Sequence, residues 1–148
     1  MLCRWGSKLR ELQMSNPVVL ITGGLTGIGR ATAIAFAKEG ARLVVAGRHE
    51  DAGRKLTTEL RALGAEAEFV RADVRHEDEV RDLVDRTVAR FGRLDVAVNN
   101  AGTEGQVGPI TDQTEESYAA TFDTNVLGVI LRECEFIRLL PFSEGVSA

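Results

Sequence analysis

Cysteine is scarce in this sequence: Cys3 and Cys134 are the only two among 148 residues. Two cysteines cannot form a disulfide framework, so the composition favours a reducing compartment, and we expect a cytoplasmic protein. No apolar run approaches the length of a membrane span. Neither sign of charge predominates, because 18 Lys and Arg are interspersed with 22 Asp and Glu at a net charge of −4. We therefore expect no nucleic-acid partner and no membrane partner, and the sequence offers no pattern of metal ligands.

A glycine-rich turn stands between an apolar run and a helical pattern. Residues 18–21 are apolar and mostly β-branched, which predicts a buried strand. From residue 28 the apolar spacing predicts a helix that ends at Gly40, with one apolar face made of Ile28, Ala31, Ala35 and Phe36. A strand, a glycine turn and a helix N-terminus together make an anion site, because backbone N–H groups and the helix dipole both favour negative charge there.

The three glycines of this turn suit a dinucleotide. Gly23 allows the tight turn, Gly27 lets the backbone approach a pyrophosphate, and Gly29 lets the helix pack closely on the strand. The spacing Gly-x-x-x-Gly-x-Gly is looser than the G-x-G-x-x-G form, and a plain turn before an ordinary helix is the alternative. A P-loop is excluded, because Arg30 and Ala31 stand where a lysine and a hydroxyl residue would be needed.

Strands and helices alternate through the rest of the sequence. We expect strands at residues 42–46, 66–71 and 95–98, and helices at residues 49–63, 77–91 and 114–140. The first of these helices has an apolar stripe of Leu56, Leu60 and Leu63. Strands separated by helices of this length predict βαβ units, and right-handed crossovers make the sheet doubly wound. The fold class is therefore α/β, with a doubly wound parallel sheet of about four strands and flanking helices.

The residues that follow each strand are the informative ones, because ligands of such sheets bind at the carboxyl ends of the strands. An NAD-binding unit would carry Asp or Glu after its second strand, for the ribose hydroxyls. Here Gly47 leaves no carboxylate to repel a 2′-phosphate, and Arg48 offers a guanidinium to bind one. This pair favours NADP over NAD; the alternative is a solvated surface arginine.

Two further groups follow the third and fourth strands. Asp73 follows the third, where a short acid can accept a hydrogen bond from an adenine amino group while Val74 packs on the ring; a helix N-cap is the alternative. Residues 99–102, Asn-Asn-Ala-Gly, follow the fourth strand and line the same crevice. Together with the glycine turn and Arg48, they place four groups at one edge of one sheet.

These motifs together resemble the classical short-chain dehydrogenase/reductases. The resemblance covers residues 17–131 and rests on Thr22-Gly23-x-x-x-Gly27-Ile28-Gly29, Asp73-Val74, Asn99-Asn100-Ala101-Gly102 and Thr124-Asn125-Val126-x-Gly128. It implies a Rossmann-fold, NAD(P)(H)-dependent oxidoreductase that acts on alcohols and carbonyls, commonly as a dimer or tetramer.

The resemblance also implies a role for each motif. The glycine turn would hold the pyrophosphate and adenosine ribose, Arg48 the 2′-phosphate, and Asp73 with Val74 the adenine. Asn125 would shape a proton-relay water near the active site; a buried polar group that stabilises a helix is the alternative. The expected cofactor-binding residues are thus Gly23, Leu25, Thr26, Gly27, Ile28, Gly29, Arg48, Asp73, Val74, Asn100, Ala101 and Gly102.

The catalytic pair of the family is missing from this sequence. Family chemistry implies a serine and a Tyr-x-x-x-Lys pair, in which the lysine cation lowers the tyrosine pKa. The single tyrosine, Tyr118, is followed four residues later by Phe122, and no lysine follows Lys55. We expect Tyr118 and Phe122 to be packing residues, and we expect this chain to be inactive or nearly so.

We expect three parts: a disordered N-terminal extension at residues 1–16, with Met14 as a candidate natural start, a partial Rossmann domain at 17–131, and a divergent tail at 132–148. Truncation, alternative splicing or a reading-frame shift would explain the tail; a genuine short binding module is the alternative.

The family's strand order, 3-2-1-4, would leave residues 96–98 as an unpaired edge, so we expect marginal stability and weak cofactor binding. Self-association, or pairing with a relative, would use the helix at 114–140.

Overall fold

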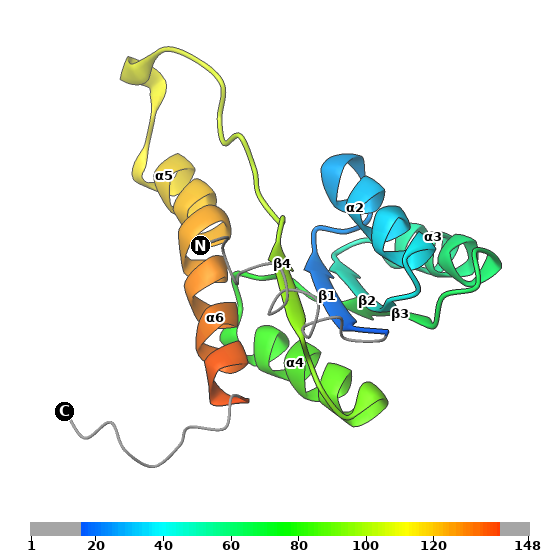
Figure 1. Cartoon of the computed structure of the whole chain (residues 1–148). Coiled ribbons are helices and arrows are strands. Elements are labelled where there is room, and N and C mark those ends of the chain that lie inside the picture. Colours follow the sequence, from blue (N-terminus) through cyan, green and yellow to red (C-terminus); the bar gives the residue numbers. More distant parts are fainter. Residues whose placement is uncertain (1–15, 140–148) are drawn as a thin grey trace, which may run out of the picture.

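A four-stranded parallel sheet with helices on both faces organises the protein (Figure 1). The computed structural model describes residues 16–139, so residues 1–15 of the expected N-terminal extension, with the Met14 start, and residues 140–148 of the expected tail lie outside the described residues. The strand order is β3-β2-β1-β4, which confirms the predicted α/β class and the predicted order. The elements are β1 (Val18–Thr22), α2 (Gly27–Lys38), β2 (Arg42–Gly47), α3 (Glu50–Ala62), β3 (Ala67–Arg71), α4 (Glu77–Phe91), β4 (Val96–Asn99), η1 (Ile110–Asp112), α5 (Glu115–Phe122), η2 (Asp123–Leu127) and α6 (Gly128–Arg138).

Alternate residues of the strands contribute to two hydrophobic cores, one on each face of the sheet. On one face, Val19 and Ile21 of β1 pack with apolar residues of α2 and α3. On the other face, Val18 and Leu20 pack with α4, and Phe136 of α6 packs against this second core. β1 is buried at every position, because it lies between β2 and β4 and is covered on both faces. This double burial explains its unbroken apolar sequence.

The face that α2 turns to the sheet differs from the prediction. Its buried residues are Gly29, Ala33 and Ala37, whereas Ile28 is 80% exposed, Ala31 and Ala35 are exposed and Phe36 is partly buried. The predicted apolar face was therefore wrong: small side chains one turn apart let α2 approach the sheet closely, Ile34 and Phe36 pack at the margin of this core, and Ile28 points to solvent. In α3, Leu56 and Leu60 are buried as expected, but Leu63 follows the end of the helix and is exposed.

The two edges of the sheet differ in chemistry. β3 carries Glu68, whose carboxylate pairs with Arg86 and Arg90 of α4. β4 has the sequence Val-Ala-Val-Asn, without a charged residue, and among residues 16–139 it pairs with β1 alone. The apolar, unpaired edge expected at residues 96–98 is therefore present.

The single helix predicted at residues 114–140 is instead three consecutive segments. α5 begins at a capping box, in which the Thr114 hydroxyl accepts from the Ser117 amide and the Ser117 hydroxyl accepts from the Thr114 amide. The π-helical segment η2 then separates α5 from α6. A π-helical turn holds an extra residue, so it rotates the face of the helix that follows, and such turns are frequent at functional sites.

α6 packs against α4 and lies on the β4 side of the sheet, whereas β3 forms the opposite edge (Figure 1). Gly128, its first residue, lies so close to Val74 that a Cβ at this position would collide with the valine side chain. One turn further on, Arg132 is fully buried and donates to the side chain of Asn99, the last residue of β4. α6 thus closes one side of the region beyond the strand ends.

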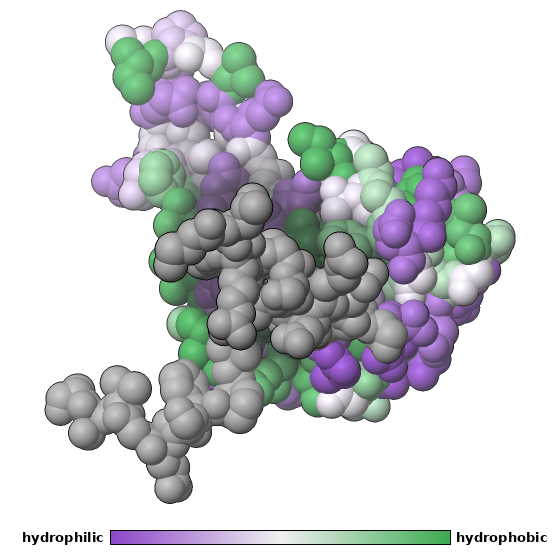
Figure 2. All heavy atoms as spheres, viewed as in Figure 1, coloured by the Kyte–Doolittle hydropathy of each residue, from purple (hydrophilic) through white to green (hydrophobic). Residues whose placement is uncertain are grey.

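An apolar stripe on α5, η2 and α6 remains exposed. It consists of Tyr118, Phe122, Val126, Leu127, Ile130 and Ile137, and we call it the α5–α6 stripe. Figure 2 shows hydrophobic surface along this part of the molecule. Tyr118 and Phe122 stack on each other at a centroid distance of 4.2 Å, yet Tyr118 is 61% exposed. The two rings therefore pack together, as expected of packing residues, but on the surface of the described structure rather than in a core.

Candidate functional site

The carboxyl ends of the strands open into one hollow of about 670 Å³. Its walls come from the glycine turn, the turn after β2, the turn after β3, the loop after β4 and Thr124 of η2. Most of the residues predicted from the sequence line it, namely Gly23, Leu25, Thr26, Gly27, Ile28, Arg48, Asp73, Val74, Asn100, Ala101 and Gly102. Gly29 is buried behind the turn, and Asn125 lies beside the hollow.

Three residues that line the hollow were missed by the sequence analysis. His49 follows Arg48 directly, so its position after β2 could have indicated it. Glu104 belongs to the loop after β4, and Thr124 reaches the hollow from η2. Thr124 stands next to Asn125 in a motif of the sequence, but that motif assigns it no role, and the packing of η2 beside the strand ends brings it to the hollow.

A buried threonine ties the ends of β1 and β4 together beneath the hollow. The Thr22 hydroxyl donates to the Val98 carbonyl at 3.3 Å. It accepts from the amides of Asn100 and Ala101, each at 3.3 Å. The side-chain amide of Asn100 donates in turn to the Gly23 carbonyl at 2.9 Å. These bonds hold the two turns against each other and form one continuous floor.

Each glycine of the turn meets a different requirement. A Cβ on Gly29 would collide with the side-chain amide of Asn100 and with the Gly23 carbonyl. Gly23 has a φ of +63° and lies against the backbone of Ala101. Gly27 has a φ of +51°, and no atom lies within 4 Å of the place where its Cβ would stand. The backbone at Gly27 therefore faces open space in the hollow, a cradle that fits a pyrophosphate.

The N-terminus of α2 carries no acidic side chain, unlike the N-termini of α3 and α4. The first turn of α3 holds Glu50 and Asp51, and that of α4 holds Glu77, Asp78 and Glu79. The first turn of α2 holds no acidic residue, and no side chain caps it. Its N–H groups and the positive end of its dipole are therefore available to an external anion.

Arg48 lies at the rim of the hollow and is exposed. Among the described residues it forms neither a hydrogen bond nor an ion pair, whereas other arginines such as Arg30 and Arg54 are paired with carboxylates. It also lines a neighbouring hollow of about 440 Å³, together with Arg75. The guanidinium of Arg48 is therefore free to meet an anionic group of a ligand.

Two carboxylates line the hollow, those of Asp73 and Glu104, and that of Asp73 is held ionised by a neighbouring arginine. Arg75 donates to it from Nε at 3.0 Å and from Nη2 at 2.6 Å. These side-chain hydrogen bonds, opposed by partial burial, lower the pKa of Asp73 to about 2. At neutral pH the carboxylate is therefore a pure acceptor, as a contact with an amino group requires.

The Asp73–Arg75 pair predicts a specific pH dependence of stability. Because the pKa of Asp73 is lower in the folded chain than in the unfolded one, its contribution is present above the ordinary pKa and is lost as the pH falls toward 2. We expect Asp73→Asn to unfold more easily than the original protein at neutral pH, by up to about 2 kcal/mol. Urea unfolding of both proteins between about pH 6 and pH 2 should show this gap closing. A gap that stayed constant would contradict the assignment.

Asn125 is exposed in η2 and connects this segment to the loop after β4. Its Oδ1 accepts from the Thr103 amide and its Nδ2 donates to the Thr103 carbonyl, each at 2.8 Å. The side chain therefore holds the loop that follows residues 99–102, beside the hollow. Its suggested part in a proton relay stays a prediction.

The hollow combines an anion cradle at the glycine turn with the cation of Arg48, unpaired among the described residues, and the acidic side chains of Asp73 and Glu104. Among residues 16–139, no group of three or more His, Cys, Asp or Glu side chains is placed to hold a metal ion. No helix within the same range is long and apolar enough to cross a membrane. The parallel sheet, the glycine turn and the uncapped helix together define a class of protein, the nucleotide-binding α/β domains of the Rossmann type.

Comparison with known proteins identifies the family within this class. The family model described as short chain dehydrogenase matches residues 17–145, so the chain belongs to the short-chain dehydrogenase/reductase family of oxidoreductases, as its motifs indicated. It is 42% identical to L-fucose dehydrogenase of Oryctolagus cuniculus over 77% of this chain and 39% of that protein. It is 35% identical to 3beta-hydroxysteroid dehydrogenase of Mediterraneibacter gnavus over 90% of this chain and 48% of that protein.

Solved structures of the family have the same fold. A short chain dehydrogenase/reductase from Burkholderia phymatum, in complex with NAD, superposes with a TM-score of 0.83 at 34% identity, over 87% of this chain and 46% of that one. A variant of actinorhodin polyketide ketoreductase, with NADPH, gives a TM-score of 0.80 at 36% identity, over 84% and 47%. The chain therefore spans less than half the length of these relatives.

Proposed function

We propose that this chain supplies the dinucleotide-binding half of an oxidoreductase that transfers hydride between a nicotinamide cofactor and an alcohol or carbonyl. The observation that carries the proposal is the open cradle at Gly27, above the floor formed by Thr22 and Asn100 and next to the uncapped N-terminus of α2. The nicotinamide supplies the hydride chemistry when the cofactor is bound. The residues of the hollow would bind the pyrophosphate and orient the adenosine.

The proposed cofactor is NADP(H) rather than NAD(H). Similar proteins have been solved with either one, so membership of the family does not decide between them. The residues after β2 favour NADP(H): Gly47 offers no carboxylate to the ribose, and Arg48 is an unpaired cation at the rim of the hollow. A charge-assisted contact with a 2′-phosphate would satisfy it.

Replacement of Arg48 tests this preference. We expect NADPH to raise the midpoint of thermal unfolding more than NADH does in the original protein. In Arg48→Ala most of that difference should vanish, because a contact with one charged group is worth about tenfold in affinity. Arg54→Ala, on the exposed face of α3, is the matched control and should keep the difference. Equal responses of the original protein to NADPH and NADH would contradict the preference, and no response to either would contradict the function.

We propose that these 148 residues bind the cofactor without catalysing hydride transfer at family rates. The sequence has one tyrosine and no Tyr-x-x-x-Lys pair, so it offers no general acid of the family's kind. The division into a domain at residues 17–131 and a divergent tail, the truncation that would explain it, and a cytoplasmic location all stay predictions. The alcohol or carbonyl substrate would belong to a whole protein of the relatives' length.

The α5–α6 stripe favours a second candidate function, that of an interaction module. Its exposed side chains follow one another at helical spacing over α5, η2 and α6, and they are uncharged. Such a stripe is self-complementary, so a second copy of the chain would bury both stripes about a two-fold axis. We therefore propose self-association through this surface.

A charge placed in the stripe tests the self-association. Ile130 is 53% exposed, so Ile130→Glu leaves the fold intact while it puts a carboxylate into the proposed contact. Sedimentation velocity should show a shift from dimer to monomer. Ile110→Glu is the matched control, because Ile110 is 86% exposed on η1, outside the stripe, and this variant should remain dimeric. A monomeric original protein at micromolar concentration would contradict the proposal.

A further inference from the structure

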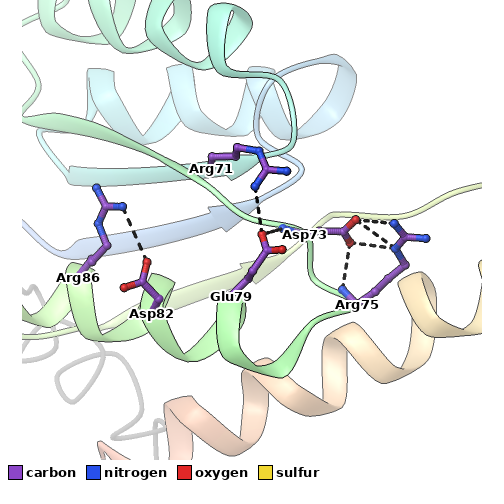
Figure 3. A network of polar contacts seen from close by, with 6 residues as sticks. All are labelled: Arg71, Asp73, Arg75, Glu79, Asp82 and Arg86. Carbon is purple, nitrogen blue, oxygen red and sulfur yellow. Dashed lines mark hydrogen bonds and ion pairs between the residues drawn. The ribbon is translucent and has the colours of Figure 1, made fainter.

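A network of charged residues holds the backbone and side chain of Asp73 in place (Figure 3). On one side, the Glu79 carboxylate, from the first turn of α4, accepts from the Asp73 amide at 2.9 Å. The same carboxylate lies 3.6 Å from Nη1 of Arg71, the last residue of β3. The backbone at Asp73 is thus held by one residue of β3 and one residue of α4.

On the other side, Arg75 holds the carboxylate itself. The Arg75 amide donates to Oδ1 at 3.1 Å, and Nε donates to Oδ1 at 3.0 Å and to Oδ2 at 3.2 Å. Nη2 donates to Oδ2 at 2.6 Å. This fork, with the amide beside it, fixes both the rotamer and the plane of the carboxylate, as two parallel donors of a guanidinium do.

Arg75 approaches Asp73 from outside the main hollow. Asp73 lines the hollow of about 670 Å³, whereas Arg75 lines only the neighbouring one of about 440 Å³, with residues of the loop after β4 and of α5. An ionised carboxylate has about four lone-pair positions. Three N–H groups, those of the amide, Nε and Nη2, take up about three of these positions, so about one remains, and Asp73 presents it in a fixed direction to the main hollow that it lines.

We propose that Arg75 is a positioning residue that fixes the Asp73 carboxylate. Held in this way, the carboxylate makes the hollow favour a base with an exocyclic amino group over a base with a carbonyl oxygen at the same ring position. The inference rests on the proposed function, since it concerns the adenine end of the same site. Arg75 does not touch the ligand in this account. It acts by preventing the carboxylate from turning away or taking up a proton.

The test compares two cofactors that differ in the 6-substituent of the purine and, with it, in the hydrogen on the adjacent N1. NADPH carries the 6-amino group of adenine, and its hypoxanthine analogue carries a carbonyl oxygen, which an ionised carboxylate repels. We expect the original protein to bind NADPH about tenfold more tightly than the analogue, the size of one charge-assisted hydrogen bond. In Arg75→Ala the ratio should fall toward one, through loss of NADPH affinity with little change for the analogue. Arg75→Lys, which keeps the charge but not the fork, should give an intermediate ratio.

Arg86→Ala is the matched control, because Arg86 pairs with Asp82 and Glu68 in the same region without touching Asp73 (Figure 3). It should keep the ratio of the original protein. A ratio unchanged in Arg75→Ala, or an equal loss of affinity for both cofactors, would overturn the inference, since either result means that Arg75 acts only on the fold. Tighter NADPH binding by Arg75→Ala would also overturn the inference, because it would mean that Arg75 and the adenine amino group compete for the Asp73 carboxylate. If neither cofactor bound the original protein, the proposed function itself would fail. If both bound the original protein equally well, the proposed function would stand and only the inference about Arg75 would fail.

Discussion

Gly29→Ala should abolish the binding of the dinucleotide and destabilise the protein. A Cβ at this position would collide with the side-chain amide of Asn100 and with the Gly23 carbonyl. These are the two groups whose hydrogen bond, at 2.9 Å, joins the glycine turn to the turn after β4. Because both groups are anchored, the added methyl must displace α2 or break that bond. Overpacking of this kind costs about 1–3 kcal/mol.

Thermal unfolding with and without NADPH measures both effects of Gly29→Ala. We expect a lower midpoint without ligand and no rise with it. Gly108→Ala is the matched control, because its backbone is not left-handed and no atom lies within 4 Å of the position its Cβ would take. That variant should behave as the original protein does. A Gly29→Ala protein with a normal midpoint and a normal NADPH response would show that the turn does not have the geometry described here.

Arg132→Met should stabilise the protein by about 1–3 kcal/mol, because it removes a charge from the interior. The Arg132 side chain has no exposed surface, and burial lowers its pKa. It contacts Asn99 and Glu133, but Nη1 is buried without a hydrogen-bond partner. Both contacting side chains reach solvent, so neither is left as a buried, unpaired group when the arginine is removed.

Urea unfolding of Arg132→Met and of the original protein measures this gain. Methionine is close to arginine in length and fills the same space without the charge. Arg54→Met is the control: it removes an exposed i,i+4 pair with Glu50 and should leave the unfolding midpoint almost unchanged. Destabilisation by Arg132→Met would mean that the contact with Asn99 outweighs the cost of burial.

The sequence was sufficient for the sheet and for most of the hollow, because these depend on local signals. The apolar run at residues 18–21, the glycine turn and the residues after each strand occur at fixed positions relative to the chain direction. A parallel sheet then brings all the strand ends to one edge. The predicted helix at residues 77–91 has the same bounds as α4, since its apolar stripe is regular and Gly92 adopts a left-handed conformation at its end.

The features that the sequence did not reveal depend on contacts between distant elements. Ile28 was expected to face the sheet, but the close approach of α2 selects Gly29, Ala33 and Ala37 instead. The π-helical segment η2 has no signal in the periodicity, and it is what brings Thr124 to the hollow. Arg132 is charged yet fully buried, whereas its hydropathy predicts an exposed side chain.

Hydrogen exchange with and without NADPH shows whether the ends of β1, β3 and β4 form one dinucleotide site. We expect NADPH to slow the exchange of backbone amides in three separate segments together, residues 23–29, 72–75 and 100–103. Amides of α6 should change little. Protection confined to one of these segments, or found in α6 instead, would contradict a single site at the strand ends.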